Sequence, residues 1–166
     1  MKMFKNFYAD AYFKDITEVS SQFLKEHGIE AMILDVDNTL VGHDVPIPEA
    51  RILSHLRSLE NDGIRLCIVS NNTMERVAAF AEKIDIKYFV ADAFKPSKKG
   101  YDGACETLSL SCEKIAAIGD QVFTDVWGAK RAGCFAILTK PLYKGGETFF
   151  IAIKRILEKP FIINRF

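Results

Sequence analysis

Short apolar runs and helical stripes alternate along this chain of 166 residues. The runs hold four to six residues and are rich in β-branched or aromatic side chains, which is typical of strands covered on both faces of a parallel sheet. Between the runs, apolar residues recur at intervals of three and four positions, the spacing of one helix face. The predicted strands are residues 31–36, 65–69, 88–91, 115–118 and 135–138.

Four predicted helices separate these strands. The first follows Pro48 and stops near Gly63, and the last stops at Gly133, in agreement with the preference for proline at helix starts and glycine after helix ends. Further helices are expected at 15–27 and 145–158. Strict alternation of strand and helix predicts an α/β fold, with a doubly wound, mainly parallel, five-stranded sheet and helices on both of its faces. We expect a single domain over 1–166 with its core at 31–138.

Composition narrows the class of protein. A hydrophobic share of 49% is enough for one sizeable core and excludes disorder as the main state. The 22 basic and 22 acidic residues balance, so no nucleic-acid partner is expected. No apolar run approaches the roughly 18 residues of a membrane-spanning helix, and the N-terminus does not read as a targeting segment, which makes a cytoplasmic location the default expectation. The four cysteines are widely spaced, which favours buried thiols over disulfides.

The C-terminal segment departs from the even charge balance. Residues 144–166 hold five basic side chains against Glu147 and Glu158, and their apolar residues gather on one helical side. The favoured interpretation is a helix packed on the sheet, because most amphipathic helices face a core. The alternative is a peripheral contact with an anionic membrane surface.

Polar residues follow four of the predicted strands at the point where each strand ends. Asp35-Val-Asp37-Asn-Thr-Leu follows the first, Ser70-Asn71 the second, Lys95 the third, and Gly-Asp120 the fourth, with Asp125 five residues further on. Ligand sites of open α/β sheets lie beyond the carboxyl ends of the strands. The sequence therefore predicts one site that gathers several carboxylates, one hydroxyl and one ammonium group.

Carboxylates crowded in one place repel one another unless a cation lies among them. Oxygen ligands of this kind suit Mg²⁺, which commonly shares its site with a phosphate. The predicted metal ligands are Asp35, Asp37, Asp120 and Asp125. In a phosphate-ester site, Asp35 can attack phosphorus and Asp37 can protonate the leaving oxygen and then activate water. The predicted phosphate-binding residues are Ser70, Asn71 and Lys95.

Taken together, these residues resemble the four motifs of the haloacid dehalogenase superfamily, a family of phosphotransferases with a Rossmann-like core. Asp35-Val-Asp-Asn-Thr-Leu is similar to its first motif, Ser70 to its second, Lys95 to its third, and Gly119-Asp120 with Asp125 to its fourth. The resemblance implies the roles given above, with Asp37 as the acid/base of the phosphatase branches. The segments 40–64 and 73–88 leave no room for a large cap domain, so the chain resembles the capless subfamily IIIA.

The motif pair and the lead-in Asp15-Ile-Thr resemble, more narrowly, the group of phosphatidylglycerophosphate phosphatases and their bacterial relatives. The resulting hypothesis is a Mg²⁺-dependent phosphomonoester hydrolase that forms an aspartyl-phosphate and acts on a lipid phosphate such as phosphatidylglycerophosphate. One alternative is another small or macromolecular phosphate ester. A phospho-accepting receiver-like module is less favoured, because the order of its acidic residues and lysine along the strands differs. No oligomeric state is predicted.

Overall fold

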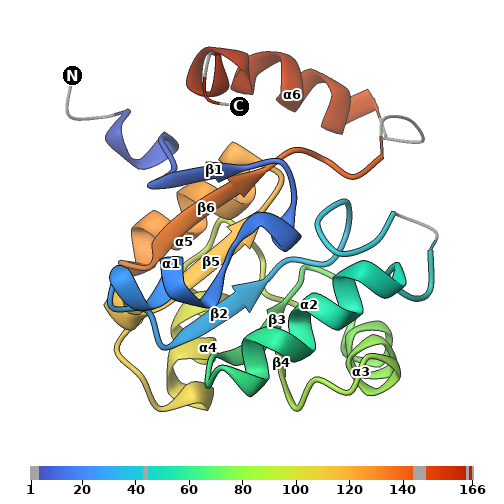
Figure 1. The fold of residues 1–166 in the computed structure, drawn as a ribbon. Coiled ribbons are helices and arrows are strands. Elements are labelled where there is room, and N and C mark those ends of the chain that lie inside the picture. Colours follow the sequence, from blue (N-terminus) through green and yellow to red (C-terminus); the bar gives the residue numbers. More distant parts are fainter. Residues whose placement is uncertain (1–3, 43–44, 144–148, 164, 166) are drawn as a thin grey trace.

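One sheet of six parallel strands runs through the molecule in the order β1-β6-β5-β2-β3-β4 (Figure 1). The computed structural model describes residues 4–42, 45–143, 149–163 and 165. Strand β2 lies at the centre, where Ala31 is opposite Arg65 of β3 and Ile115 of β5. The strands are β1 (Ala11–Phe13), β2 (Ala31–Leu34), β3 (Arg65–Val69), β4 (Tyr88–Val90), β5 (Ile115–Gly119) and β6 (Phe135–Thr139).

The five predicted strands are present, but the predicted count is wrong because β1 adds a sixth at the edge of the sheet. This strand has only three residues, fewer than the apolar runs of four to six residues from which the other strands were predicted. Asp10, just before it, fixes the pairing with β6. Its backbone N–H donates to the carbonyl of Ala136 at 2.8 Å, and its carboxylate accepts the N–H of Ala136 at 2.8 Å.

Helices cover both faces of the sheet, as the doubly wound prediction requires. The alternation of side chains along β2 divides the core, since Met32 and Leu34 join one apolar cluster and Ala31 and Ile33 join the other. The first cluster packs against α1 (Ser21–Glu26), α2 (Ala50–Asn61) and α3 (Met74–Lys83), and the second packs against α4 (Lys99–Leu108) and α5 (Trp127–Ala132).

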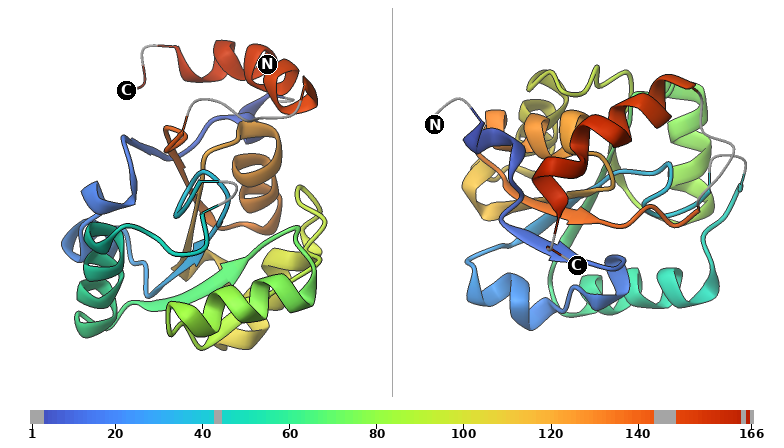
Figure 2. Two further views of the ribbon diagram at one scale, coloured as in Figure 1. Left: turned by 90° about the vertical axis from the view of Figure 1, so that its right-hand side faces the viewer. Right: turned by 90° about the horizontal axis from the view of Figure 1, so that it is seen from above.

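Both terminal helices differ in extent from their predictions. The expected helix at 15–27 is divided into a 3-10 turn, Ile16–Glu18, and α1, because the Ser20 hydroxyl accepts the N–H of Phe23 and starts a new helix. The expected helix at 145–158 is α6 (Phe149–Ile162), and residues 144–148 lie outside the described residues. Figure 2 shows α6 lying across one edge of the molecule beside the N-terminal segment. Within the described part of the chain, no helix has the length and apolar character needed to cross a bilayer.

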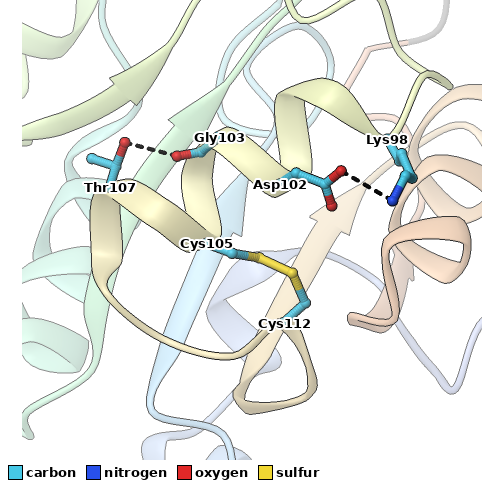
Figure 3. Close-up of a disulfide and its surroundings, with 6 residues drawn as sticks. All are labelled: Lys98, Asp102, Gly103, Cys105, Thr107 and Cys112. Atoms are coloured by element: carbon cyan, nitrogen blue, oxygen red, sulfur yellow. Dashed lines mark hydrogen bonds and ion pairs between the residues drawn. A yellow bond between two sulfur atoms is a disulfide. The ribbon is translucent and has the colours of Figure 1, made fainter.

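A disulfide joins the end of α4 to the turn that follows it (Figure 3). The prediction of four free thiols is therefore wrong for Cys105 and Cys112, whose Cα atoms lie 5.6 Å apart. Ser109 ends α4 in the left-handed conformation, with φ of 51°, and the chain then turns back past the helix. A pair seven residues apart becomes adjacent only through this reversal, which spacing alone does not reveal. Cys67 and Cys134 are buried and free, as expected.

Candidate active site

Most of the polar residues predicted from the strand ends meet in one pocket of about 240 Å³, whereas Asp120 lines a different pocket. They come from the loops after β5, β2, β3 and β4, which are four consecutive strands of the sheet. Helix α6 supplies a further wall that sequence reasoning did not anticipate. The pocket is lined by Asp35, Asp37, Ser70, Asn71, Asn72, Lys95, Gln121, Thr124, Asp125, Ile151 and Lys154.

Asp35 lies directly after β2, where its backbone N–H still donates to the carbonyl of Ile118 in β5, at 3.1 Å. The strand ladder thus fixes its backbone. Thr39 Oγ1 donates to one carboxylate oxygen at 2.8 Å, and Lys95 Nζ donates to the other at 2.5 Å. Burial raises the pKa of Asp35 to about 6, against the opposing attraction of Lys95. The carboxylate is held in one orientation at the pocket floor.

Three carboxylates, those of Asp35, Asp120 and Asp125, offer oxygen atoms that all lie within 4.8 Å of one another. Burial, together with the charges of Asp35 and Asp125, raises the pKa of Asp120 to about 8. Asp120 Oδ1 is buried and finds no hydrogen-bond partner among the residues that the structure describes. A buried oxygen of this kind, beside two further carboxylates, is the donor set that a hard divalent cation prefers.

A π-helical turn, Val122–Val126, brings Asp125 back to this group. Its carboxylate accepts the N–H of Gln121 at 3.1 Å, so the turn closes on its own side chain. A Cβ atom at position 119 would meet that side chain at 2.4 Å, which explains the need for Gly119 at the end of β5. The close approach of strand end and turn therefore depends on a glycine.

Lys95 is the cation inside the acidic group. Its side chain is only 5% exposed, and Nζ donates to Asp35 at 2.5 Å and to Asp125 at 2.7 Å. Burial alone would lower the pKa of Lys95, but Asp125 and Asp35 raise it well above its usual value. Lys95 is therefore a permanent positive charge at the pocket floor.

The Asn71 side chain lines the pocket and is bonded to the backbone of Lys95, and its role as a phosphate ligand stays a prediction. Its Oδ1 accepts the backbone N–H of Lys95 at 2.6 Å, and its Nδ2 donates to the Lys95 carbonyl at 3.3 Å. The amide side chain offers one acceptor and one donor that match this backbone pair, so it positions the loop that carries the lysine. The polar Ser-Asn-Asn sequence gave no sign of this role.

Asp37 lies apart from the three clustered carboxylates. Asn72 Nδ2 donates to one of its oxygens at 2.7 Å, and a guanidinium nitrogen of Arg76 lies 3.0 Å from the other. Asp37 is not among the carboxylates whose oxygens lie within 4.8 Å of one another, and its role as a metal ligand stays a prediction. Arg76 was missed by the sequence analysis, although it stands four residues after Asn72, at helical spacing.

Ser70 follows β3 and is buried. Its backbone N–H donates to the carbonyl of Val90 at 3.0 Å, which fixes the strand end. The Ser70 hydroxyl oxygen accepts both the backbone N–H and the Nδ2 of Asn72, each at 3.1 Å. Both bonds use the oxygen as acceptor, so the hydroxyl hydrogen is suited to donate to a ligand oxygen.

A second pocket, of about 330 Å³, shares Ser70 and Asn72 with the first. Most of its wall is apolar. Arg76 and Lys83 are its cations, and they lie on one face of α3, seven residues and therefore about 10 Å apart. The apolar wall consists of Val36, Val41, Val45, Pro46, Val77, Ala79 and Phe80.

Helix α6 is tied to the acidic group by two polar contacts. The Arg155 guanidinium donates to the carboxylate and to the backbone carbonyl of Asp120. Glu158 Oε1 accepts the N–H of Phe123, in the π-helical turn, at 2.8 Å. Burial raises the pKa of Glu158 to about 7, against the effect of that hydrogen bond. The sequence distinguishes neither residue from the other charges of the C-terminal segment.

Comparisons with known proteins agree with this geometry. A family model described as a haloacid dehalogenase-like hydrolase matches residues 2–133. A Bacillus subtilis (strain 168) protein named probable phosphatase YqeG is 35% identical over 155 residues, covering 93% of this chain and 89% of that protein. An Arabidopsis thaliana protein named phosphatidylglycerophosphate phosphatase 1, chloroplastic/mitochondrial, is 25% identical over 158 residues, covering 87% of this chain but 44% of that protein.

Among solved structures, the chain is similar in fold to the cobalt-bound form of deoxy-D-mannose-octulosonate 8-phosphate phosphatase from Haemophilus influenzae. The TM-score is 0.55 at 16% sequence identity, and the match covers 83% of this chain and 90% of that one. At this level of identity the likeness concerns the fold alone.

Proposed function

The chain belongs to the haloacid dehalogenase-like hydrolases, and from this membership we propose that it is a Mg²⁺-dependent phosphomonoesterase that works through Asp35. One observation carries the proposal most directly. The Asp35 carboxylate lies at the floor of the strand-end pocket, in contact with the ammonium of Lys95 and close to two further carboxylates. A phosphate ester that enters this pocket meets a fixed nucleophile and a fixed positive charge together.

Asp35, Asp120 and Asp125 are the residues that would hold Mg²⁺. The unpartnered, buried Oδ1 of Asp120 and the mutual approach of the three carboxylates support this set. A bound Mg²⁺ supplies positive charge that offsets the repulsion between carboxylates and phosphoryl oxygens. We leave Asp37 out of the set, because its carboxylate is directed to Asn72 and Arg76.

The residues of the chain divide the remaining chemistry. An Asp35 oxygen forms a bond to phosphorus while the bond from phosphorus to the leaving oxygen breaks, which gives an aspartyl-phosphate. Asp37 donates its proton to that leaving oxygen, then accepts a proton from the water that cleaves the aspartyl-phosphate. Ser70 donates to a phosphoryl oxygen, and Lys95 offsets the charge that builds up beside Asp35. Thr39 keeps Asp35 aimed at the pocket.

For the substrate, we propose a lipid phosphate such as phosphatidylglycerophosphate. The apolar second pocket adjoins Asp37 through Arg76 and Asn72, on the side where a leaving group would extend. Its cations suit a leaving group that carries its own negative charge beside an apolar part. The name of the Arabidopsis relative supports the same substrate class.

A panel of phosphate esters tests both levels of the proposal. Purified protein should hydrolyse p-nitrophenyl phosphate with Mg²⁺, and both EDTA and Asp35→Asn should abolish turnover. Phosphatidylglycerophosphate presented in vesicles should be hydrolysed faster than soluble sugar phosphates. Equal rates on the two classes of substrate would refute the preference for a lipid phosphate but would still support phosphatase activity. Full activity in Asp35→Asn would refute the assignment of Asp35 as the nucleophile.

A further inference from the structure

Helix α6 turns two of its charged side chains inward and several of its apolar side chains outward, although Phe161 and Ile162 pack on the core. Its charged residues Arg155 and Glu158 point inward to the pocket loops, and Glu158 is only 2% exposed. The apolar residues that face solvent recur at helical spacing and form one stripe. These residues are Ile153 (39% exposed), Ile156 (61%), Leu157 (58%) and, just past the helix, Ile163 (63%). Surface helices normally hide such a stripe in the core.

The apolar stripe continues onto the N-terminal segment. Phe161 of α6 packs against Phe4 and Tyr8, with ring centroids 6.4 and 5.4 Å apart. Phe4 and Tyr8 are themselves exposed. Figure 2, seen from above, shows the N-terminal segment and α6 side by side. We call the combined set of Phe4, Tyr8, Ile153, Ile156, Leu157 and Ile163 the α6 surface.

The exposed charges next to the stripe along the C-terminal segment are basic. Glu158 is the sole acidic residue in the sequence of α6, and it is turned inward. The exposed charges beside the stripe are those of Lys159 and Arg165, and the guanidinium of Arg165 lies over the rings of Tyr8 and Tyr12. An apolar strip bordered by cations and aromatic rings has the chemistry of a segment that lies in the interface of an anionic bilayer.

We propose that the α6 surface docks the protein on an anionic lipid bilayer, with its apolar side chains below the headgroups and Lys159 and Arg165 among them. The same helix lines the strand-end pocket through Ile151 and Lys154, so docking would hold that pocket within about one helix diameter, ~10 Å, of the membrane. Two copies of the chain joined through this surface would bring like charges together, which disfavours a dimer. The benefit of docking to catalysis rests on the proposed function, whereas docking itself does not.

Vesicle binding by the full chain tests the docking. The probe is vesicles of phosphatidylserine and phosphatidylcholine, which are compared with vesicles of phosphatidylcholine alone. Neither lipid is a phosphomonoester, so no substrate of the proposed enzyme is present. The wild-type protein should sediment with the anionic vesicles at least about tenfold more strongly, and this preference should weaken as salt rises. The double variant Ile156→Glu/Leu157→Glu should lose at least about tenfold of that binding. Both side chains are solvent-exposed, so the fold should be retained, as circular dichroism can verify.

Ile47→Glu is the matched control. Ile47 is also an exposed apolar residue (47%), but it lies outside α6, so this variant should bind vesicles as the wild type does. Absence of vesicle binding by the wild type, or equal binding by the double variant, would overturn the proposal. A dimer in light scattering that the double variant disperses, without vesicle binding, would assign the surface to a second copy and overturn it as well.

Activity separates this inference from the proposed function. Asp35→Asn should bind vesicles as the wild type does while losing turnover of p-nitrophenyl phosphate. If the wild-type protein bound vesicles but hydrolysed no phosphate ester, the docking proposal would be supported and the phosphatase proposal would be refuted. For an active enzyme, the double variant should lower the ratio of vesicle-substrate to p-nitrophenyl phosphate turnover by at least about tenfold. An unchanged ratio would overturn the link between docking and the pocket.

Discussion

The strand-end pocket and helix α6 adjoin each other, yet their polarity is arranged in opposite ways. In the pocket, Lys95 is buried and paired with two carboxylates. Removing any one of these groups leaves a buried charge without its partner, which is costly. On α6, the charged residues Arg155 and Glu158 point inward, while Ile153, Ile156 and Leu157 face water. The pocket pairs most of its charges within the chain, whereas the outer face of α6 leaves apolar side chains exposed to water. Substitutions in the pocket should therefore affect catalysis and stability, and substitutions on the exposed face of α6 should affect membrane binding.

The largest effect is expected for the acid/base at the pocket edge. Asp37→Asn should lower kcat by roughly 10²–10⁴-fold, because the leaving oxygen loses its proton donor. The loss should be larger for an alkyl phosphate, a poor leaving group, than for p-nitrophenyl phosphate. Steady-state kinetics on both substrates measures it, with the exposed Asp62→Asn as control. An equal loss on both substrates would contradict the role of proton donor.

Lys95→Met should have the next largest effect, on stability as well as activity. Removing the buried ammonium leaves Asp35 and Asp125 facing each other, at a cost of about 3–5 kcal/mol in the free energy of unfolding. The control is Lys98→Met, which breaks an exposed ion pair with Asp102 and should cost less than about 1 kcal/mol. Urea denaturation of both variants in EDTA decides the matter. Similar losses in the two would mean that Lys95 is not the internal counter-ion.

The pH dependence of stability should separate the pocket from an ordinary acidic surface. The folded-state pKa values of Asp35, Glu158 and Asp120 are raised to about 6, 7 and 8. Between the unfolded values near 4 and these values, the folded state binds more protons than the unfolded state. The free energy of unfolding of the metal-free protein should therefore fall as pH rises from about 4 to about 8.

The raised pKa of Asp35 alone corresponds to a loss of about 3 kcal/mol in the free energy of unfolding over this pH range, at 1.36 kcal/mol per pKa unit. Millimolar Mg²⁺ should restore stability at pH 8 and have little effect at pH 5, because metal binding needs deprotonated carboxylates. Thermal denaturation with EDTA or Mg²⁺ at both pH values measures this. Equal stabilisation by Mg²⁺ at pH 5 and pH 8 would argue against a carboxylate site.

The smallest effect is expected where α6 meets the pocket. Glu158→Ala leaves the buried N–H of Phe123 without its acceptor and should cost about 1–3 kcal/mol. Glu158→Gln keeps an acceptor oxygen and should cost clearly less. Denaturant unfolding of the pair compares them. Equal losses would show that the charge of Glu158, rather than its hydrogen bond, holds α6 in place.

The pocket was more predictable from sequence than α6, for a physical reason. Parallel strands end at one edge, so polar residues placed just after them, such as Asp35 and Ser70, converge whatever the details of the loops. The separation of Asp37 from the clustered carboxylates and the backbone role of Asn71 depend on side-chain directions, which spacing does not encode. Helical periodicity locates the apolar stripe of α6 but does not say which face turns inward. That choice is made by Arg155 and Glu158, whose partners are distant in the chain.

The elements of the fold were also predictable only where a local sequence pattern determines them. Five strands were predicted from apolar runs of four to six residues, whereas β1, with only three residues, is recognised as a strand only through its pairing with β6. The Cys105–Cys112 disulfide likewise depends on the left-handed turn at Ser109 that ends α4. Features set by local pattern were predictable, and features set by a meeting of distant or reversed segments were not.

Rapid quenching of the enzyme during turnover, followed by peptide mass spectrometry, tests the central claim most directly. With Mg²⁺ and p-nitrophenyl phosphate, one phosphoryl group should appear on the peptide that contains Asp35 within a single turnover and should decay when substrate is exhausted. Asp35→Asn should show no such adduct. Steady turnover without phosphorylation of that peptide, or a phosphoryl group on a different residue, would contradict the account.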